Sequence, residues 1–334
     1  MRIIFAGSPA IAVPALEALA VLALENAEQG GAPVPPAGSF ELAGILSNPD
    51  SPRGRHGKPE PTEVAAAAAA LGSRFEGAGR KPPFLMKPER LGSEIRGKIE
   101  ALGPDILVSF AYGRIFGPKF LALFPLGGIN IHPSLLPAYR GPAPIPQAIL
   151  NRDRETGISV QRLALEMDCG DILVQEAFPL DGTETTAGLS GEMARRAAVL
   201  IPQVLRGIAA GTMEGRPQDG EKASYCRLLS REDGRIDWGR GAFDIEARIR
   251  AYTPWPLSWT MDGDQRLYIN KALAGPAGTA APGTVLGIDR ERGILVQTGE
   301  GTLAVSALQY GGKKALDWKA FLNGARGFIG RRLG

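Results

Sequence analysis

The first half of the chain alternates short apolar runs with longer segments of helical character. The run Arg2–Gly7 has the composition of a buried parallel strand, and the Ala- and Leu-rich stretch that follows it favours a helix. The same alternation places strands at 2–7, 42–47, 106–110 and 129–132, and helices at 10–28, 62–71, 93–102 and 186–208. Strands that alternate with helices form a doubly wound, mostly parallel sheet. We therefore expect an α/β domain of Rossmann-like type.

The second half of the chain has a different pattern. Residues 211–220 are rich in Gly, Pro and polar side chains, as in a linker. Beyond them, short alternating runs such as 284–286 and 294–297 are separated by turn residues, which is typical of a small β-rich domain. We expect an α/β domain at 1–208, a linker at 209–222 and a smaller β-barrel domain of OB-like type at 223–334.

The content of cysteine, histidine and apolar residues excludes several classes of protein. The two cysteines and two histidines, Cys169, Cys226, His56 and His132, are too few for a disulfide framework or a histidine-rich metal centre. No apolar run reaches the roughly 18 residues that a membrane helix needs, and the apolar stretch after Met1 is too short for a signal peptide. We expect a soluble, cytoplasmic, monomeric protein with no metal and no membrane partner.

Formal charge is unevenly distributed along the chain. Residues 1–220 hold 21 Lys and Arg against 23 Asp and Glu, whereas residues 221–334 hold 17 against 12. The excess of positive charge therefore lies in the C-terminal part. Such an excess is typical either of a solvated basic surface or of a surface that binds phosphate, and charge by itself favours the solvated surface.

A polar pair interrupts the strand expected at 129–132. Side chains alternate along a strand, so Asn130 and His132 point to one face while Ile129 and Ile131 pack on the other. Open α/β sheets bind their ligands at the carboxyl ends of the strands. An amide and an imidazole at that end are two hydrogen-bond donors suited to a developing oxyanion, although a lone histidine is more often structural.

Asp168 is the candidate charge partner of His132. A carboxylate beside an imidazole raises the pKa of the imidazole, and we expect Asp168 to keep His132 protonated. The alternative is that Asp168 is only a turn residue before Gly170.

No G-x-S-x-G motif surrounds Ser134, so we expect this hydroxyl to cap the following loop rather than act as a nucleophile. Residues 7–12 lack the second and third glycines of a dinucleotide fingerprint, which argues against an NAD site.

Several short motifs occur here in a characteristic order and spacing. They are Asn130-x-His132, Ser134-Leu135-Leu136-Pro137, Arg140-Gly141 and the turn Asp168-x-Gly170-Asp171. Together they resemble the formyltransferases that use 10-formyltetrahydrofolate. Further motifs at 48–55, 228–238, 254–256 and 311–324 make the chain similar to the methionyl-tRNA formyltransferases over nearly its whole length.

This resemblance implies a Rossmann-like formyltransferase domain and a specific reaction. A formyl group would pass from 10-formyltetrahydrofolate, a cosubstrate, to the α-amino group of methionine on initiator tRNA, for translation initiation. The resemblance implies catalytic roles for Asn130, His132 and Asp168. It also implies folate contacts by the motif residues Ser134, Leu135, Leu136 and Pro137 and by the main chain near Arg114 and Ile115.

Basic side chains are the candidate tRNA contacts. Arg55 and Lys58 belong to a Gly- and Pro-rich loop that leaves the strand at 42–47 toward the expected site, and Lys313 and Lys314 belong to the basic C-terminal part. The loop at 30–39 lengthens the first crossover relative to the family pattern. Two alternatives stay open: an RNA-binding protein with a degenerate α/β domain, and a folate-dependent formyltransferase that acts on a sugar amine or another small amine. A requirement for folate would distinguish the chain from the RNA-binding protein, and a requirement for tRNA would distinguish it from the formyltransferase that acts on a small amine.

Overall fold

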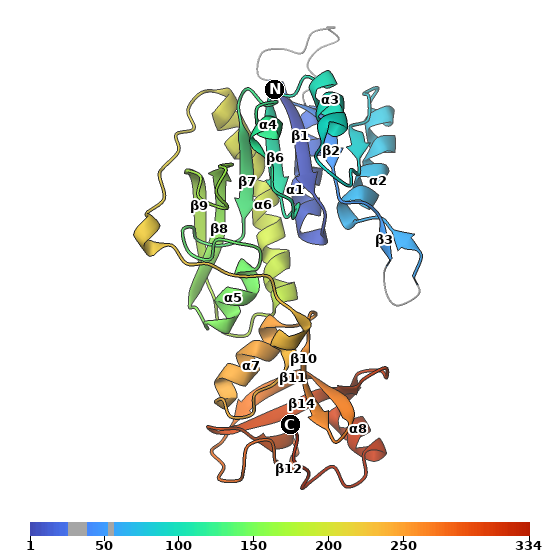
Figure 1. Cartoon of the computed structure of the whole chain (residues 1–334), viewed down its shortest axis with the longest axis vertical. Helices are drawn as coiled ribbons and strands as arrows, with labels where there is room; N and C mark the ends of the chain where they lie inside the picture. Colours follow the sequence, from blue (N-terminus) through green and yellow to red (C-terminus); the bar gives the residue numbers. More distant parts are fainter. Residues whose placement is uncertain (26–38, 53–56) are drawn as a thin grey trace. The chain divides into compact units, whose positions relative to one another are not determined.

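The structure is a computed structural model that describes residues 1–25, 39–52 and 57–334. Its backbone separates into two units, whose elements are labelled in Figure 1. The first unit comprises Met1–Pro142, Gly157–Phe178 and Ser190–Tyr225, and the second comprises Ala143–Thr156, Pro179–Leu189 and Cys226–Gly334. The predicted loop at 30–39 lies outside the described residues except for its last residue, and so does Arg55.

A seven-stranded sheet in the order β5-β2-β1-β6-β7-β8-β9 forms the centre of the first unit. Its strands are β1 (Arg2–Gly7), β2 (Glu41–Leu46), β5 (Phe84–Met86), β6 (Ile106–Phe110), β7 (Gly128–His132), β8 (Glu155–Arg162) and β9 (Ile172–Pro179). The five strands from β5 to β7 pair in parallel, and β8 pairs antiparallel with β7. The expected mostly parallel sheet is confirmed. A small hairpin, β3 (Ser51–Pro52) and β4 (Pro59–Glu60), lies apart from it.

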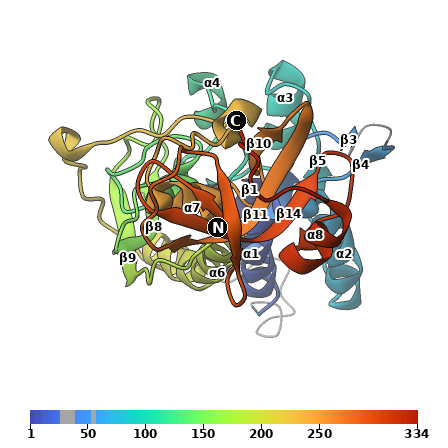
Figure 2. The same ribbon diagram turned by 90° about the horizontal axis from the view of Figure 1, so that it is seen from below.

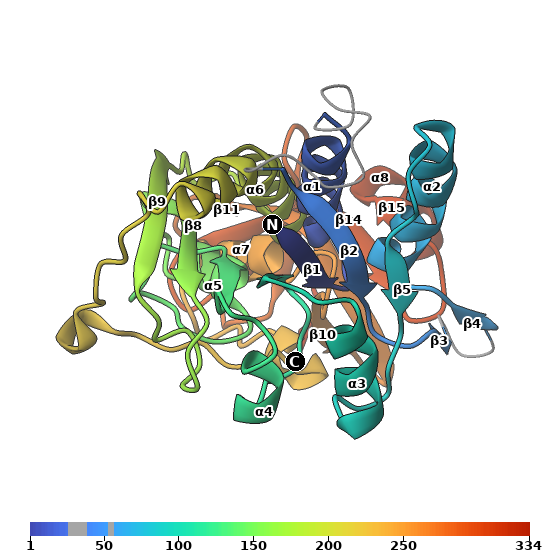
Figure 3. The same ribbon diagram turned by 90° about the horizontal axis from the view of Figure 1, so that it is seen from above.

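Helices cover both faces of this sheet, as Figure 3 shows. On one face lie α1 (Val13–Glu25), α2 (Glu63–Gly77) and α6 (Thr186–Ala209), and on the other lie α3 (Ser93–Ala101) and α4 (Pro118–Leu121). The 3-10 turn η1 (Ala10–Ala12) precedes α1. Thr62 caps α2, since its side chain accepts a hydrogen bond of 3.1 Å from the backbone N–H of Ala65. The helix continues beyond its predicted end because Leu71 and Phe75, one turn apart, are both buried.

The second unit contains an antiparallel sheet in the order β10-β11-β14-β13-β12, with β15 paired to β14. Its strands are β10 (Ser258–Asp262), β11 (Gln265–Gly275), β12 (Val285–Asp289), β13 (Gly293–Gln297), β14 (Thr302–Tyr310) and β15 (Leu316–Asp317). The unit also holds α5 (Pro144–Leu150), α7 (Ala242–Ala251), α8 (Trp318–Gly324) and the 3-10 turn η3 (Arg231–Gly234). Figure 2 shows α7 and α8 beside the sheet, and a cluster of buried Ile, Leu and Val side chains forms its core.

The C-terminal residues connect the two outer strands of this sheet. The N–H of Val285 in β12 donates to the carbonyl of Arg331 over 2.8 Å, and the N–H of Gly334 donates to the carbonyl of Met261 in β10 over 3.1 Å. The C-terminal segment therefore pairs with backbone groups of both edge strands. In a closed barrel, pairing of this kind removes exposed strand edges.

Residues 209–222, which were predicted to be a linker, lie within the first unit. Arg216 forms a two-way backbone pair with Ile172 at the start of β9, over 2.8 and 2.9 Å, and η2 (Gly220–Lys222) follows. The limits proposed for the domains stay a prediction, because the units interleave along the chain.

Within the described ranges, no helix combines the length and apolarity required to cross a bilayer. The same residues contain no cluster of three side chains suited to hold a metal ion.

Candidate functional site

Loops from four strands meet at the carboxyl edge of the parallel sheet. Asn48, which follows β2, connects three of them: its N–H donates to the Ser8 hydroxyl over 3.2 Å, and its side-chain amide donates to the Tyr112 carbonyl over 3.0 Å. Its Oδ1 accepts a hydrogen bond of 2.7 Å from Nε of Arg114. The loops after β1, β2 and β6 are thereby joined beside the end of β7, the edge at which parallel α/β sheets bind ligands.

Strand β7 presents Asn130 and His132 on one face, as its alternation predicted. Ile129 and Ile131 are buried on the opposite face. His132 is 4% exposed and Asn130 is half-buried. In the neighbouring strand β8, Gln161 stands directly opposite Asn130. Directly opposed residues of an antiparallel pair share a face, so the polar cluster extends across two strands.

Asp168 lies against both predicted donors. Its Oδ1 is 3.6 Å from Nδ1 of His132, 3.5 Å from Nδ2 of Asn130 and 2.9 Å from Nε2 of Gln161. Its Oδ2 accepts a hydrogen bond of 2.8 Å from the N–H of Gly141. The three residues Asn130, His132 and Asp168 therefore form one cluster, and Asp168 does more than terminate a turn.

The environment of His132 corrects the expected protonation state. Burial lowers the pKa of the imidazole below its ordinary value of 6.5, and this effect outweighs the Asp168 carboxylate and the Tyr139 carbonyl, which both raise it. Nε2 of His132 is 2.9 Å from the Tyr139 carbonyl oxygen, which only accepts hydrogen bonds, so Nε2 carries the proton. In the neutral ring the lone pair is then on Nδ1, which faces Asp168. The prediction that Asp168 keeps His132 protonated was wrong, because burial of the ring lowers its pKa more than the carboxylate raises it.

The loop after β7 is held by polar groups of its own and by groups of the neighbouring strand β8. Ser134 is 1% exposed, and its hydroxyl donates to the Ala138 carbonyl over 2.6 Å, which is the loop-capping role expected for it. Ser159 of β8 accepts from the N–H of Leu136 and donates to the Ser134 carbonyl. Leu136 is 3% exposed, whereas Leu135 and Pro137 are half-buried. Leu135 and Pro137 are therefore the side chains of this motif that a ligand reaches more readily.

The other predicted folate contacts lie at the same sheet edge. Arg114 is half-buried and also donates to the Glu89 carbonyl over 2.5 Å, whereas Ile115 exposes 77% of its surface. An exposed apolar side chain beside a fixed loop offers contact area to a planar ring. Ile115 is therefore accessible to a ligand at this edge, and its contact with folate stays a prediction.

The predicted tRNA contacts fall in both units. Lys58 is exposed next to β4, and its loop partner Arg55 lies outside the described residues. Lys313 and Lys314 are exposed in the turn between β14 and β15, where Nζ of Lys313 is 5.7 Å from the centre of the Tyr310 ring. Lys58 belongs to the first unit, as do Asn130, His132 and Asp168, whereas Lys313 and Lys314 belong to the second.

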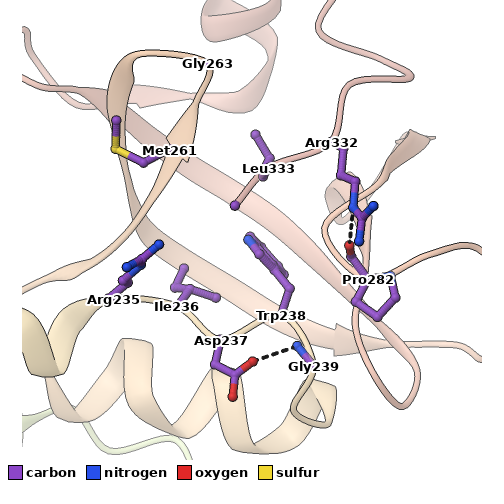
Figure 4. A pocket seen from close by; sticks show the side chains of 11 residues that line it. Arg235, Ile236, Asp237, Trp238, Gly239, Met261, Gly263, Pro282, Arg332 and Leu333 are labelled. Atoms are coloured by element: carbon purple, nitrogen blue, oxygen red, sulfur yellow. Dashed lines mark hydrogen bonds between the residues drawn. The ribbon is translucent and has the colours of Figure 1, made fainter.

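An open pocket of about 850 Å³ lies in the second unit. Figure 4 shows Arg235 and Arg332 on either side of Trp238, with Arg332 bonded to the Pro282 carbonyl. Arg331, its neighbour in sequence, instead donates to both oxygens of Asp262 over 3.1 and 3.0 Å. Two arginines that are far apart in the sequence therefore line one pocket. The count of charges along the chain did not indicate that they lie together.

Sequence analysis also missed contacts that surround the cluster of Asn130, His132 and Asp168. Gln161, Gly141, Tyr139 and Gln218 all contact Asp168 or His132. A signal existed for Gln161, because polar side chains alternate with buried Ile158 and Val160 along β8. The backbone contacts of Gly141 and Tyr139 leave no signal in a sequence.

The chain is similar to known formyltransferases throughout its length. The family model described as formyl transferase matches residues 24–205, and the one described as formyl transferase, C-terminal domain matches residues 228–326. The methionyl-tRNA formyltransferase of Treponema denticola is 45% identical over 98% of this chain and 98% of its own length. That of Treponema pallidum is 42% identical over 100% of this chain and 99% of its own length.

Solved structures share the fold at lower identity. An N-formyltransferase from Helicobacter canadensis, in complex with folinic acid and dTDP-3-aminofucose, superposes with a TM-score of 0.61. It is 18% identical, with 91% of this chain and 99% of that chain covered. At this identity the sugar formyltransferase supports the fold alone. The family models and the two curated relatives carry the assignment: the chain belongs to the methionyl-tRNA formyltransferase family.

Proposed function

We propose that this chain transfers a formyl group from 10-formyltetrahydrofolate to the α-amino group of methionine on initiator tRNA, in the cytoplasm and as a monomer. The observation that carries the proposal is the cluster of Asn130, His132 and Asp168 at the carboxyl edge of a formyltransferase sheet. The folate supplies an activated formyl carbon, and every other step falls to side chains of this cluster.

The amino group forms a bond to the formyl carbon, and negative charge develops on the formyl oxygen. The amide of Asn130 is the donor for that oxygen, because it is half-buried and its hydrogen bond to Asp168 is long, at 3.5 Å. A weakly held donor is free to turn toward a stronger acceptor.

His132 is the proton carrier in this proposal. Its neutral ring holds a lone pair on Nδ1, so it accepts the proton that the amine loses on forming the new bond. The resulting imidazolium lies 3.6 Å from the Asp168 carboxylate, which stabilises its charge. The same proton then passes to the departing folate nitrogen, which leaves His132 neutral again.

Basic side chains of the second unit are proposed to contact the tRNA backbone. Lys313 and Lys314 are exposed, and Arg235 and Arg332 border the open pocket of Figure 4. Arg331 is not one of these candidates, because its guanidinium group is already paired with Asp262. Arg55 and Lys58 stay predicted contacts of the first unit.

The test supplies the purified protein with 10-formyltetrahydrofolate and one of three acceptors: initiator methionyl-tRNA, uncharged initiator tRNA, or a nucleotide-linked amino sugar. Formylmethionine released from the charged tRNA alone supports the proposal. Formylation of the amino sugar, or no folate consumption with any acceptor, contradicts it. Mass measurement of the product identifies the formylated amine directly.

A further inference from the structure

We propose that Gln218 is a positioning residue for formyl transfer, which holds the Asp168 turn so that the carboxylate faces His132. This inference rests on the proposed function, and nothing in the motif Asn130-x-His132 or in the Asp168 turn predicts it. Gln218 lies 50 residues after Asp168 in sequence, inside the segment 209–222 that resembles a linker.

Both ends of this segment are anchored to the first unit. Arg216 pairs with Ile172 at the start of β9, and the Ser224 carbonyl accepts a hydrogen bond of 2.8 Å from the N–H of Arg140. The residues on each side of Gln218 are exposed, while Gln218 itself is half-buried. A single side chain thus turns inward from an exposed segment, toward the catalytic cluster.

The amide nitrogen of Gln218 contacts three oxygen atoms in and beside the Asp168 turn. Nε2 is 2.8 Å from the Asp168 carbonyl, 2.7 Å from the Gly170 carbonyl and 3.1 Å from Oε1 of Gln161. Gln161 in turn donates to the Asp168 carboxylate. Gln218 therefore restrains the main chain of Asp168 directly and its side chain through Gln161.

The orientation of the Gln218 amide is fixed by Arg140. Oε1 of Gln218 accepts from Nε and Nη2 of Arg140 over 3.1 and 2.8 Å. A guanidinium group only donates, so the amide oxygen must face it and the amide nitrogen must face the carbonyls. Arg140 is 6% exposed and its Nη1 also lies 3.2 Å from the Tyr225 hydroxyl, which limits its movement.

The turn needs such a restraint because its backbone is strained. Asp168 has a φ of 55°, in the left-handed region that residues other than glycine rarely adopt. Gly170 lies so close to β8 that an added Cβ would meet the Arg162 carbonyl oxygen at 1.9 Å. A strained turn persists only where its surroundings hold it, and Gln218 binds the carbonyl of the strained residue itself and that of Gly170, two residues later.

The experiment compares Gln218→Leu, Gln218→Glu and the control Gln203→Leu, an exposed glutamine in α6 of the same unit. Gln218→Leu removes both ends of the bridge, whereas Gln218→Glu keeps an oxygen for Arg140 but loses the N–H donors. We expect each Gln218 variant to lower kcat for methionyl-tRNA formylation by about 10- to 100-fold, with KM for folate and tRNA changed less than about threefold. The control keeps wild-type kcat and KM.

A second readout follows His132 without any substrate. The chain has only two histidines, so NMR titration of labelled imidazole in a His56→Gln background reports His132 alone. Asp168 is the carboxylate facing the ring, and Arg140, Glu166 and Cys169 are further titratable groups near the turn. If Asp168 moves away, its raising effect is lost and the pKa of His132 falls, by about half a unit or more.

The outcomes separate the two proposals. A kcat loss together with a lower His132 pKa supports positioning by Gln218. Wild-type kcat in a folded Gln218→Leu protein, or a loss in KM alone, overturns it. An unchanged His132 pKa in that variant also overturns it. If the wild-type protein formylates no methionyl-tRNA while the His132 pKa still responds to Gln218, the acceptor is wrong and the structural link stands.

Discussion

Asn130 and His132 stand two residues apart on one strand, yet their surroundings differ. Asn130 is half-buried with a long contact to Asp168, whereas His132 is 4% exposed and bonded to the Tyr139 carbonyl. A substitution at Asn130 therefore removes little besides a donor, while a substitution at His132 also removes a packed side chain. We therefore expect the two residues, which are both proposed to act in the reaction, to contribute unequally to stability.

Asn130→Ala is expected to lower kcat by about 100- to 1,000-fold, because it removes a donor that acts mainly in the transition state. His132→Ala is expected to lower kcat as much and also to reduce the free energy of unfolding by about 1–3 kcal/mol, since it removes a packed side chain and its hydrogen bond to the Tyr139 carbonyl. Single-turnover kinetics and urea denaturation measure the two effects. Equal stability of both variants would contradict the difference in burial.

Asp168→Asn tests the charge beside His132. His132 must be neutral to accept a proton, so kcat/KM falls on the acid side as the pH drops through its pKa, which lies below 6.5. The Asp168 carboxylate raises that pKa, so its removal moves the acid limb to still lower pH. The plateau should also fall about 10- to 100-fold, because the imidazolium loses its partner. An acid limb that moves upward would refute this account.

At the scale of single elements, η3 shows how a short motif in the sequence becomes a stable turn. Its capping box joins the Ser230 N–H and hydroxyl to Asp233 over 2.6 and 2.8 Å. Asp233 also accepts from Nη1 of Arg227 over 2.9 Å. Arg227 and the Ser230 hydrogen bonds hold the pKa of Asp233 well below its ordinary value of 3.8. The turn therefore gains stability from the ionised carboxylate.

Asp233→Ala is expected to reduce the free energy of unfolding by about 1 kcal/mol at neutral pH, the usual cost of losing a cap. A lowered folded-state pKa contributes stability above pH 3.8, and that contribution is lost as the pH falls toward the folded value. The difference between wild type and variant should therefore shrink below pH 3.8. Glu232→Ala, which changes the same charge one position away, is the control. A difference independent of pH would mean that packing, not ionisation, stabilises the turn.

At the scale of the whole molecule, the proposed catalytic residues and the excess of positive charge lie in different parts of the chain. Asn130, His132 and Asp168 belong to the first unit. The positive excess belongs to the C-terminal part, where residues 221–334 hold 17 Lys and Arg against 12 Asp and Glu. Phosphate contacts by such residues release counterions, so they give binding a steep dependence on salt.

Replacing Lys313 and Lys314 together by Ala should flatten the slope of log K against log salt by about one to two units for initiator tRNA. Folate affinity should not change, since neither lysine belongs to the first unit. The matched control replaces Lys98 and Lys119, two exposed lysines of α3 and α4. Binding titrations at several salt concentrations measure the slopes. Equal flattening by both pairs would mean that net charge alone is responsible.

The sequence by itself determined four of the seven strands of the first sheet, among them β7 with its polar pair, but not β5, β8 or β9. These follow from periodicity, because a strand that alternates Asn130 and His132 with two isoleucines can bury only one face. Even β6 has its predicted limits, Ile106–Phe110. Asp168 was also identified, though only as a candidate, since nothing local requires a turn residue to meet a strand 38 positions earlier.

Only the tertiary structure decided the protonation of His132 and the support of Asp168. The pKa of a buried imidazole depends on how much water the surrounding loops exclude, which no local pattern encodes. Gln218 came from a segment with the composition of a linker, and Gly141 and Tyr139 act through backbone atoms that every residue possesses. These hydrogen bonds join residues that are distant in the sequence, so they form only once the chain has folded.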